Sequence, residues 1–424
     1  MTFQSSQAQP GSDLDQTAFL FAAAVLATAL RVIYIPQPVP ITRAEMDAVA
    51  LAIARHGAFA NPFPVTMETG PTAFVPPLYP LFISIFMRLF GEAHYFTPLA
   101  VATGLVYGLH AVLLPRLSQA LLGDQRPGLW AGVTCVAAPV LQWIPHWDAL
   151  YTAAGLMLFT LLALRLRTAG VWPVPCLCGL AAGLLALLNP SSLFVTAPLL
   201  LLAGWRNRRR APVLAMCLGA MLLTVAPWSI RNRLLVHTLS VKDNFGTALY
   251  VSNNDCARPS LIGSLDCHGI YHPFGSMAES RAVRDMGEAA YDRSRLAMAL
   301  DWIGHHRPAF ARLTLWRVVQ FWCPSTEYGS YAVACWIVTL AGAWGLLLLR
   351  RRNPFFFRLC LAVFAGYPLF YYVVISDVRY RYPILWLSLL AYGYALEAIR
   401  GRYANHWLRK DSAGSTAAAR RAGT

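Results

Sequence analysis

The stretch that decides the fold is ITRAEMDAVALAIARHGAFANPFPVTMETGPTAFVPPLYPLFISIFMRLFG, residues 41–91. It begins with a short amphipathic segment that carries Glu45 and Asp47, and it continues as a loop rich in Pro, Gly and Thr. It ends with a second amphipathic segment that opens at Pro76 and Pro77. Apolar segments of membrane-spanning length flank it on both sides, so we expect it to lie on a membrane surface as the roof of a site.

The composition is that of a membrane protein. Of 424 residues, 57% are hydrophobic and only 13% are charged, and the mean hydropathy is +0.47. Repeated uncharged runs of about 20 residues predict membrane spans. The net charge of +15 comes from arginines clustered in short loops between apolar runs, which is the orientation signal of a polytopic membrane protein. No basic patch interleaved with aromatic residues accompanies them, which argues against nucleic acid as a partner.

Length and charge set the number of spans. The segment 76–91 resembles an eleventh span, but it is short for a crossing and is broken by Arg88. We therefore predict an interfacial helix there and an all-α protein with about ten transmembrane helices, at 17–35, 97–119, 128–145, 149–167, 171–188, 190–205, 211–230, 329–349, 354–374 and 382–399.

The predicted organisation is one transmembrane domain, 17–399, between two cytoplasmic tails, 1–16 and the basic 400–424. The N-terminal tail lacks the positive region of a cleaved signal, so we expect the first run to remain as a span. Two long loops, 36–96 and 231–327, would lie outside. The second is expected to be a loop to about 275 and a helix from about 276 to 303, followed by an interfacial amphipathic segment, Ala309 to Trp322.

Few carboxylates lie near the membrane on the predicted outer side, and three are candidates for the catalytic base: Glu45, Asp47 and Asp148. Each has a structural alternative. Glu45 completes a capping box with Thr42, and Asp47 is suited to the first turn of a helix. Asp148 could cap the span that begins at Ala149, although an acid at that depth is costly unless it is paired or hydrated.

Two basic clusters face the same predicted side. Arg231 and Asn232 end the seventh span, and Arg379-Tyr380-Arg381 opens the tenth. Guanidinium groups at a membrane surface suit bidentate binding of a phosphate or pyrophosphate. The alternative is interfacial anchoring of the helices.

Histidine and cysteine suggest no metal centre. His56, His146 and His237 are not linked by metal-ligand spacing, so we predict no metal site among them. Cys256 and Cys267 enclose a ten-residue loop on the predicted oxidising side. A disulfide there would contribute about 2–3 kcal/mol through loop closure.

Several motifs together resemble the membrane glycosyltransferases of the GT-C fold, especially the protein O-mannosyltransferase and bacterial lipid A aminoarabinose transferase classes. After the first span comes a small-residue helix, Met46 to Gly57-Ala58-Phe59, and then Pro-Pro-Leu-Tyr-Pro with an amphipathic helix, Pro76 to Gly91. Later come Asp148, a Pro-Trp-x-x-Arg-Asn end (Pro227 to Asn232) and a Tyr-Arg-x-Pro (Tyr380 to Pro383). These motifs, in this order, extend over about residues 17–400.

The resemblance implies a cavity beneath the outer helices where a polyprenyl-phosphate sugar meets its acceptor. It implies a catalytic acid in the first loop, a basic group that binds phosphate, and a bacterial inner membrane with the active site on the periplasmic face. The family usually has Asp-Glu-x-x-Tyr at the helix start, where this chain has Thr42-Arg43-Ala44-Glu45-Met46. The acid role has then moved to Glu45 or Asp47, or the chain is catalytically impaired.

The sequence thus predicts a glycosyltransferase that moves a sugar from a lipid-phosphate donor to a hydroxyl of a glycolipid, polysaccharide or protein. Glu45, in preference to Asp47, would take the proton. Asp148 would orient a substrate, and Arg231 with Arg379 or Arg381 would hold the phosphate. The need for a divalent metal stays open. The alternatives are a flippase for lipid-linked sugars and an impaired descendant that binds them; the spans show almost no mid-membrane charge, unlike many transporters.

Overall fold

The computed structural model describes residues 16, 18–27, 29, 45–63, 66–138, 147–170 and 172–401. Thr42, His146, nearly all of the predicted N-terminal tail and all but the first two residues of the predicted C-terminal tail lie outside these residues. Across the described ranges the secondary structure is helical, and the only β pairing is two isolated bridges. The predicted all-α class is confirmed.

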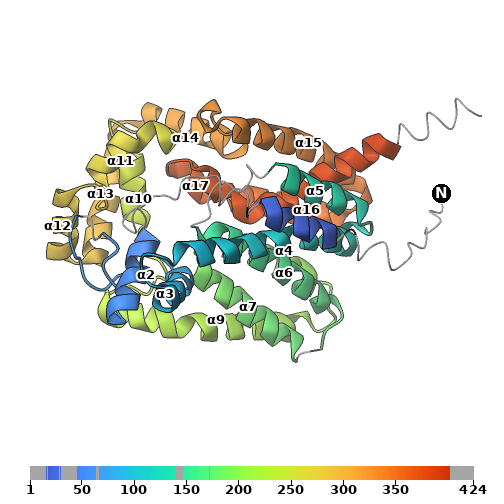
Figure 1. Cartoon of the computed structure of the whole chain (residues 1–424), viewed down its shortest axis with the longest axis horizontal. Helices are drawn as coiled ribbons and strands as arrows, with labels where there is room; N and C mark the ends of the chain where they lie inside the picture. The colour runs from blue at the N-terminus through green and yellow to red at the C-terminus, as the bar shows by residue number, and fades with distance from the viewer. Residues whose placement is uncertain are drawn as a thin grey trace, which may run out of the picture.

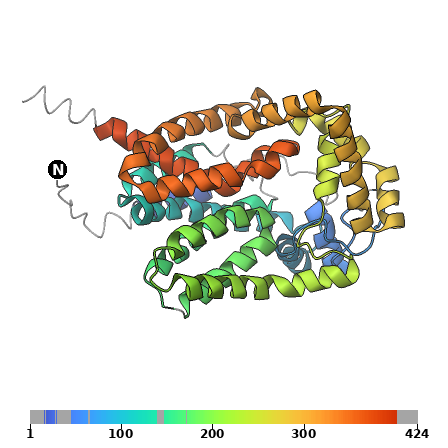
Figure 2. The ribbon, with the colours of Figure 1, turned by 180° about the vertical axis from the view of Figure 1, so that it is seen from behind.

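Long helices run side by side along the molecule, and shorter helices gather at one end (Figures 1 and 2). Six helical segments of the described chain are long and apolar enough to cross a membrane. They are Phe96–Leu122 (α4), Asp148–Arg167 (α6 with a 3-10 turn), Arg210–Leu235 (α9), Ser330–Arg352 (α15), Pro354–Val373 (α16 and α17) and Val378–Gly401.

The other four predicted spans are shorter helices or lie partly outside the described residues. Residues 128–145 contribute only α5 (Arg126–Ala137), and 17–35 contribute the described helix Ala18–Ala27. Residues 171–205 form α7 (Val174–Leu188) and α8 (Leu193–Gly204), which are 15 and 12 residues long. Prolines near the start of α7 and in the turn between the two helices limit their length, because proline favours the first helical turn and interrupts a helix interior.

Glycines allow α7 to pack closely on α9. A Cβ at Gly179 would lie 2.2 Å from the carbonyl oxygen of Cys217, and one at Gly183 would lie 2.6 Å from Thr224. The opposite face of α9 exposes Leu218, Leu222 and other apolar side chains. A small-residue contact on one side and an apolar surface on the other are typical of a membrane helix.

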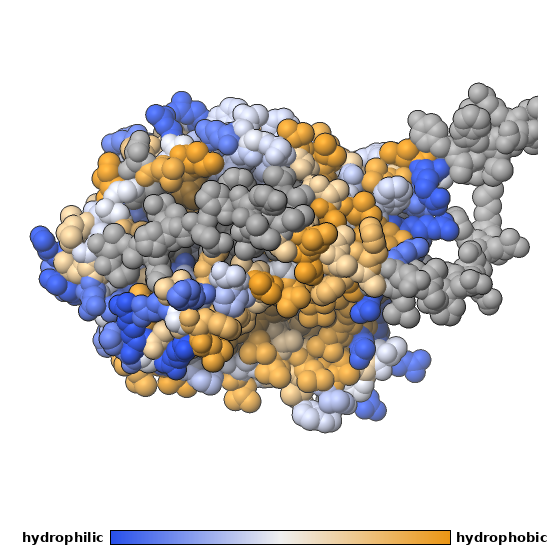
Figure 3. Space-filling view, in the orientation of Figure 1, coloured by the Kyte–Doolittle hydropathy of each residue, from blue (hydrophilic) through white to orange (hydrophobic). Residues whose placement is uncertain are grey.

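Arginine-rich turns gather at the end of the molecule where the described chain leads to both termini (Figure 1), and Figure 3 shows hydrophilic residues there beside an apolar surface. Arg167 and Arg206 stack on the Phe355 ring, with guanidinium carbons 4.1 and 5.5 Å from its centroid. Arg126 lies 3.7 Å from Glu397. The basic loops that the sequence assigned to one side therefore do lie at one end of the molecule.

The opposite end is a cap of helices. From the first loop it contains α2 (Glu45–His56) and α3 (Leu78–Phe90), and from the second it contains α10 (Phe245–Ser252), α11 (Leu265–Tyr271), α12 (Met277–Met286) and α13 (Glu288–His305). The expected loop to 275 was therefore wrong, because it contains α10 and α11. The expected helix 276–303 is divided at Gly287, whose φ of 79° ends α12.

The segment 76–91 forms the short surface helix α3 and not a span. Its 13 residues would measure about 20 Å, less than the roughly 30 Å of a hydrocarbon core. Ile83 and Met87 are buried, whereas Leu81, Ile85 and Leu89 are exposed. The Arg88 side chain donates to the Ile53 carbonyl at 2.6 Å and so ties α3 to α2.

The predicted interfacial segment 309–322 lies in α14 (Arg307–Trp322) and has an anchoring role. Arg317 is fully buried and donates to the carbonyls of Ser252 and Val373 and to the side chain of Asn253. Ser252 and Val373 end α10 and α17, so the cation stabilises two helix C-termini.

Candidate functional site

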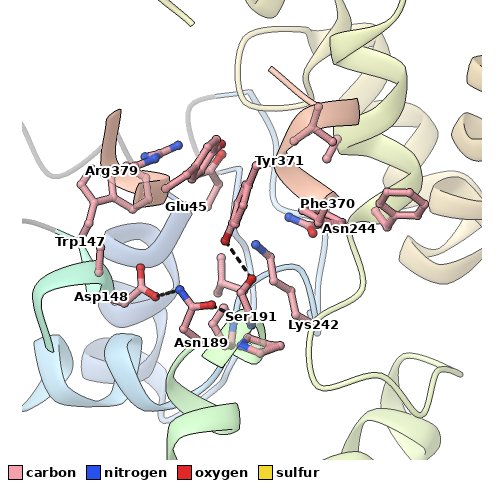
Figure 4. A pocket seen from close by; sticks show the side chains of 18 of the residues that line it. Glu45, Trp147, Asp148, Asn189, Ser191, Lys242, Asn244, Phe370, Tyr371 and Arg379 are labelled. Atoms are coloured by element: carbon pink, nitrogen blue, oxygen red, sulfur yellow. Dashed lines mark hydrogen bonds between the residues drawn. The ribbon is translucent and has the colours of Figure 1, made fainter. Parts of the chain in front are cut away.

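A cavity of about 340 Å³ lies where the cap meets the membrane helices (Figure 4). Its wall is made by the starts of α2 and α6, the turn after α7, the loop after α9, α17 and the 3-10 turn Val378–Arg381. This volume falls within the range of small-molecule sites. The polar and charged side chains that line it are those of Glu45, Asp148, Asn189, Ser191, Lys242, Asn244, Ser252, His272, Tyr367, Tyr371, Arg379 and Tyr380.

Asp148 is the first residue of α6 and is buried, with 6% of its surface exposed. The Asn189 side-chain amide donates to its Oδ2 at 2.7 Å. The orientation of Asn189 is set by its other end, because its Oδ1 accepts the backbone N–H of Ser191 at 3.0 Å and caps the 3-10 turn. A capping residue thus supplies the hydrogen bond that a buried carboxylate requires.

Glu45 opens α2 and faces the same cavity. Its Oε1 lies 3.5 Å from Nε2 of His272, which follows α11. His272 is buried between the rings of Phe63 and Phe74, at 5.9 and 5.7 Å between ring centroids. The two long outer loops therefore meet at this pair.

Two cations enter the cavity from different walls. The Arg379 guanidinium stacks on Trp147, 3.7 Å from the ring centroid, and Asp377 lies 3.9 Å away. Figure 4 shows the Lys242 side chain directed into the cavity, and the accessible surface of this residue is cavity surface. The protein walls withdraw the Lys242 amine from bulk water, which lowers its pKa, while the charges of Asp148 and Glu45 oppose this shift.

Aromatic side chains complete the wall. Tyr371 and Tyr380 stack with centroids 4.5 Å apart, and the Tyr371 hydroxyl lies 2.8 Å from that of Ser191. Phe194 and Phe245 line the cavity and are also exposed on the outside of the molecule. The site therefore combines a charged interior with an apolar margin.

Of the predicted site residues, the structure brings Glu45, Asp148, Arg379 and Tyr380 together in this cavity. Asp47 does not line it. Asp47 is buried on the inner face of α2, and burial, with the charge of Glu45 adding to it, raises its pKa to about 7. It is two residues from Glu45, so the helical turn places the two side chains on different faces.

Arg231, Asn232 and Arg381 do not line the cavity either; each bonds to the protein itself. Arg231 donates to the carbonyls of Thr72 and Phe59 at 2.6 and 2.8 Å and stacks on Trp228. The Asn232 amide donates to the Ser240 carbonyl at 2.8 Å. Arg381 is buried and donates to the Trp322 carbonyl and to Thr339 Oγ1, at 2.8 and 2.6 Å. These residues hold the cap and the last helix in place.

Sequence reasoning missed Lys242, His272 and Asn189. Lys242 stands alone in a polar loop, and His272 has no neighbour in sequence that suggests a site. Asn189-Pro190-Ser191 did carry a signal, because an Asn before a Pro turn between two apolar runs favours a cap at a membrane surface. The predicted pair Cys256 and Cys267 is joined in a disulfide, with Cα atoms 5.8 Å apart.

No metal centre is built from the residues that the structure describes around the cavity. No group of three or more His, Cys, Asp or Glu side chains gathers in the described part of the chain. The two carboxylates that face the cavity are accompanied by Lys242 and Arg379, which supply the positive charge there. We therefore derive no step through a metal.

No family model and no curated protein sequence matches the chain. Among solved structures, the Archaeoglobus fulgidus oligosaccharyltransferase in its apo form is similar, with a TM-score of 0.57 and 16% identity over 96% of this chain and 53% of that one. The same enzyme in complex with Zn and sulfate has a TM-score of 0.50 and 15% identity, over 91% of this chain and 49% of that one.

ArnT from Cupriavidus metallidurans bound to undecaprenyl phosphate has a TM-score of 0.40 and 14% identity, over 91% of this chain and 78% of that one. The chain spans about half the length of the oligosaccharyltransferase. At such low identity the first two matches bear on the fold. The chain has the GT-C fold of membrane glycosyltransferases.

Proposed function

We propose that this protein is a glycosyltransferase that uses a polyprenyl-phosphate-linked sugar and a hydroxyl acceptor. One observation carries the proposal: two carboxylates, Glu45 and Asp148, and two cations, Lys242 and Arg379, line a single cavity between the cap and the membrane helices. A sugar transfer from a lipid phosphate needs both a proton acceptor and positive charge beside the leaving group.

In the proposed reaction the acceptor hydroxyl oxygen forms a bond to the anomeric carbon while the bond from that carbon to the phosphate oxygen breaks. The phosphate leaves with the electron pair, and Lys242 and Arg379 stabilise its growing negative charge. Glu45 takes the hydroxyl proton. Asp148, held by Asn189, orients a hydroxyl of the sugar or of the acceptor.

The apolar margin supports a lipid donor. Phe194 and Phe245 belong both to the cavity wall and to the exposed surface, so a hydrocarbon chain could leave the cavity past them. The charged groups lie at the cap end, opposite the arginine-rich end. With basic turns on the cytoplasmic side, the site would face the periplasm of a bacterial inner membrane and both termini would be cytoplasmic.

A binding experiment tests the phosphate site without knowledge of the sugar or the acceptor. Farnesyl phosphate and farnesol are titrated onto the purified protein in detergent. We expect farnesyl phosphate to bind much more tightly than farnesol, and Lys242→Met and Arg379→Met each to weaken it by about 10–100-fold, the value of one or two lost charge-assisted hydrogen bonds. Arg233→Met, an exposed arginine outside the cavity, is the control and should bind as wild type does.

A transfer experiment tests the chemistry. A panel of polyprenyl-phosphate sugars is supplied with membrane glycolipid, polysaccharide and protein fractions, and Glu45→Gln and Asp148→Asn are compared with wild type. We expect Glu45→Gln to abolish transfer and Asp148→Asn to lower it strongly. Full activity in both variants would overturn the assignment. Movement of the lipid-linked sugar from one leaflet of a vesicle bilayer to the other, without transfer of the sugar to an acceptor, would indicate a flippase instead.

A further inference from the structure

His272 is fixed in place more firmly than a residue at a loop end usually is. Its own carbonyl accepts the backbone N–H groups of Gly275 and Ser276, both at 3.0 Å. The next carbonyl, that of Pro273, accepts the hydroxyls of Thr66 and Ser280 at 2.9 and 2.5 Å. The turn that carries the imidazole is therefore bonded both to the first outer loop and to α12.

The hydrogen bonds of the ring determine its tautomer. The backbone N–H of Phe274 donates to Nδ1 of His272 at 3.1 Å, so this nitrogen presents a lone pair and carries no proton. The proton of the neutral ring is then on Nε2. That nitrogen lies 3.5 Å from Oε1 of Glu45, longer than an ordinary N–H···O hydrogen bond but close enough for the two groups to attract each other.

We propose that His272 is a positioning residue for Glu45: its Nε2–H binds one carboxylate oxygen and leaves the other to receive the proton of the acceptor. This role rests on the proposed function of Glu45. A glutamate side chain has several rotatable bonds, so a donor beside its carboxylate favours one orientation.

Other ionisable groups also lie near Glu45. They are Lys242 from the loop after α9, Arg379 and Tyr380 from the 3-10 turn Val378–Arg381, and Asp47 two residues along α2. The two cations act on the carboxylate in the same direction as His272. The contribution of His272 therefore has to be measured against variants that leave these groups unchanged.

Nitrogen NMR of the histidine-labelled protein tests the pair without an activity assay. The His272 signals are assigned by their loss in His272→Gln. We expect the Nε2–H tautomer at neutral pH, and we expect Glu45→Gln to lower the pKa of His272, because a neighbouring carboxylate favours the imidazolium form. An Nδ1–H tautomer, or a His272 titration unchanged by Glu45→Gln, would overturn the proposal.

Kinetics tests the consequence for transfer. His272→Phe should lower kcat by about 100-fold, the size of effect expected when a reacting group is misplaced, while KM for the donor changes less than about threefold. The acidic limb of its pH–rate profile should move to higher pH, because the carboxylate loses a donor. His272→Gln, whose amide can replace Nε2–H, should recover most of the rate, and His56→Phe on the exposed end of α2 should behave as wild type.

The outcomes separate this inference from the proposed function. If wild type transfers no sugar, the proposed function fails, and the NMR measurement still decides whether His272 and Glu45 interact. If wild type is active and His272→Phe keeps the wild-type kcat and acidic limb, the positioning role is overturned and the proposed function stands.

Discussion

The hydrogen bond between Asn189 and Asp148 gives the sharpest test of the cavity. Asn189 does two things at once: its Oδ1 caps the turn Pro190–Ser192, and its Nδ2 donates to Asp148 at 2.7 Å. Asn189→Ser keeps an oxygen that can cap the turn but removes the amide donor. Asn189→Ala removes both, so the two variants separate the cap from the support of the carboxylate.

The magnitude follows from the burial of Asp148. A hydrogen bond to a charged group contributes about 1.5–3 kcal/mol, and the cap contributes about 1 kcal/mol. If Asp148 must be oriented in the transition state, loss of the donor converts to about a 10–100-fold fall in kcat/KM. We expect this fall in both variants, with a lower melting temperature in Asn189→Ala than in Asn189→Ser.

The assay is sugar transfer from a polyprenyl-phosphate donor, with thermal unfolding in the same detergent. Ser191, the next hydroxyl in the turn, supplies the matched control. Ser191→Ala removes the contact to Tyr371 and leaves Asn189 and Asp148 unchanged, so it should lower kcat/KM much less than Asn189→Ser. Wild-type activity in Asn189→Ser, within twofold, would refute the view that this amide orients Asp148 for the reaction.

Three further predictions concern the cap. Arg231→Met should lower the free energy of unfolding by about 3 kcal/mol, because the carbonyls of Thr72 and Phe59 lose a charged donor. The affinity of the folded variant for farnesyl phosphate should stay within twofold of wild type. A tenfold loss of affinity would instead show that Arg231 binds the phosphate. Burial raises the pKa of Glu288 from 4.5 to about 8, so the folded state retains a proton that the unfolded chain releases. That contribution to stability is fully present below about pH 4.5 and is lost as pH rises through about 8. The melting temperature should therefore fall across this pH range, and Glu288→Gln should make the fall smaller. An equal fall in wild type and Glu288→Gln would exclude Glu288 as its source. Replacing Cys256 and Cys267 together by Ser should cost about 2–3 kcal/mol of stability, and mass spectrometry of the unreduced wild type should find no free thiol at either position; two free thiols would contradict the bond.

Much of the architecture could be predicted because it follows from local sequence. The apolar runs, the basic turns and the shortness of 76–91 are properties of contiguous residues, and α3 formed where Pro76 and Pro77 predicted a helix start. The sequence did not indicate which apolar runs would form short helices, because hydropathy does not distinguish a full crossing from paired short helices such as α7 and α8. The helices α10 and α11 were missed because their short segments lack the periodicity of a long amphipathic helix.

The site was only half predictable, for a physical reason. Glu45, Asp148 and Arg379 stand out in the sequence because charge at a membrane surface is scarce and costly. Arg231 stands out equally, but its guanidinium is directed at backbone carbonyls of the first loop. Whether a cation binds a ligand or the protein depends on what lies opposite it, and here the opposing groups are about 160 residues away in the chain.

Hydropathy and charge along the chain were enough to predict a helical membrane protein, its basic turns, and a helix in 76–91 that is short for a crossing. These properties follow from hydropathy and charge summed over neighbouring residues, because the membrane interior accepts apolar segments and excludes charged ones. Only the tertiary structure decided which polar side chains share the cavity: it excluded Arg231, Asn232, Arg381 and Asp47, and it added Lys242, His272 and Asn189. Glu45, at the start of the opening stretch, meets His272 only because the second outer loop folds back onto the first, a contact between residues 227 positions apart that no local pattern encodes.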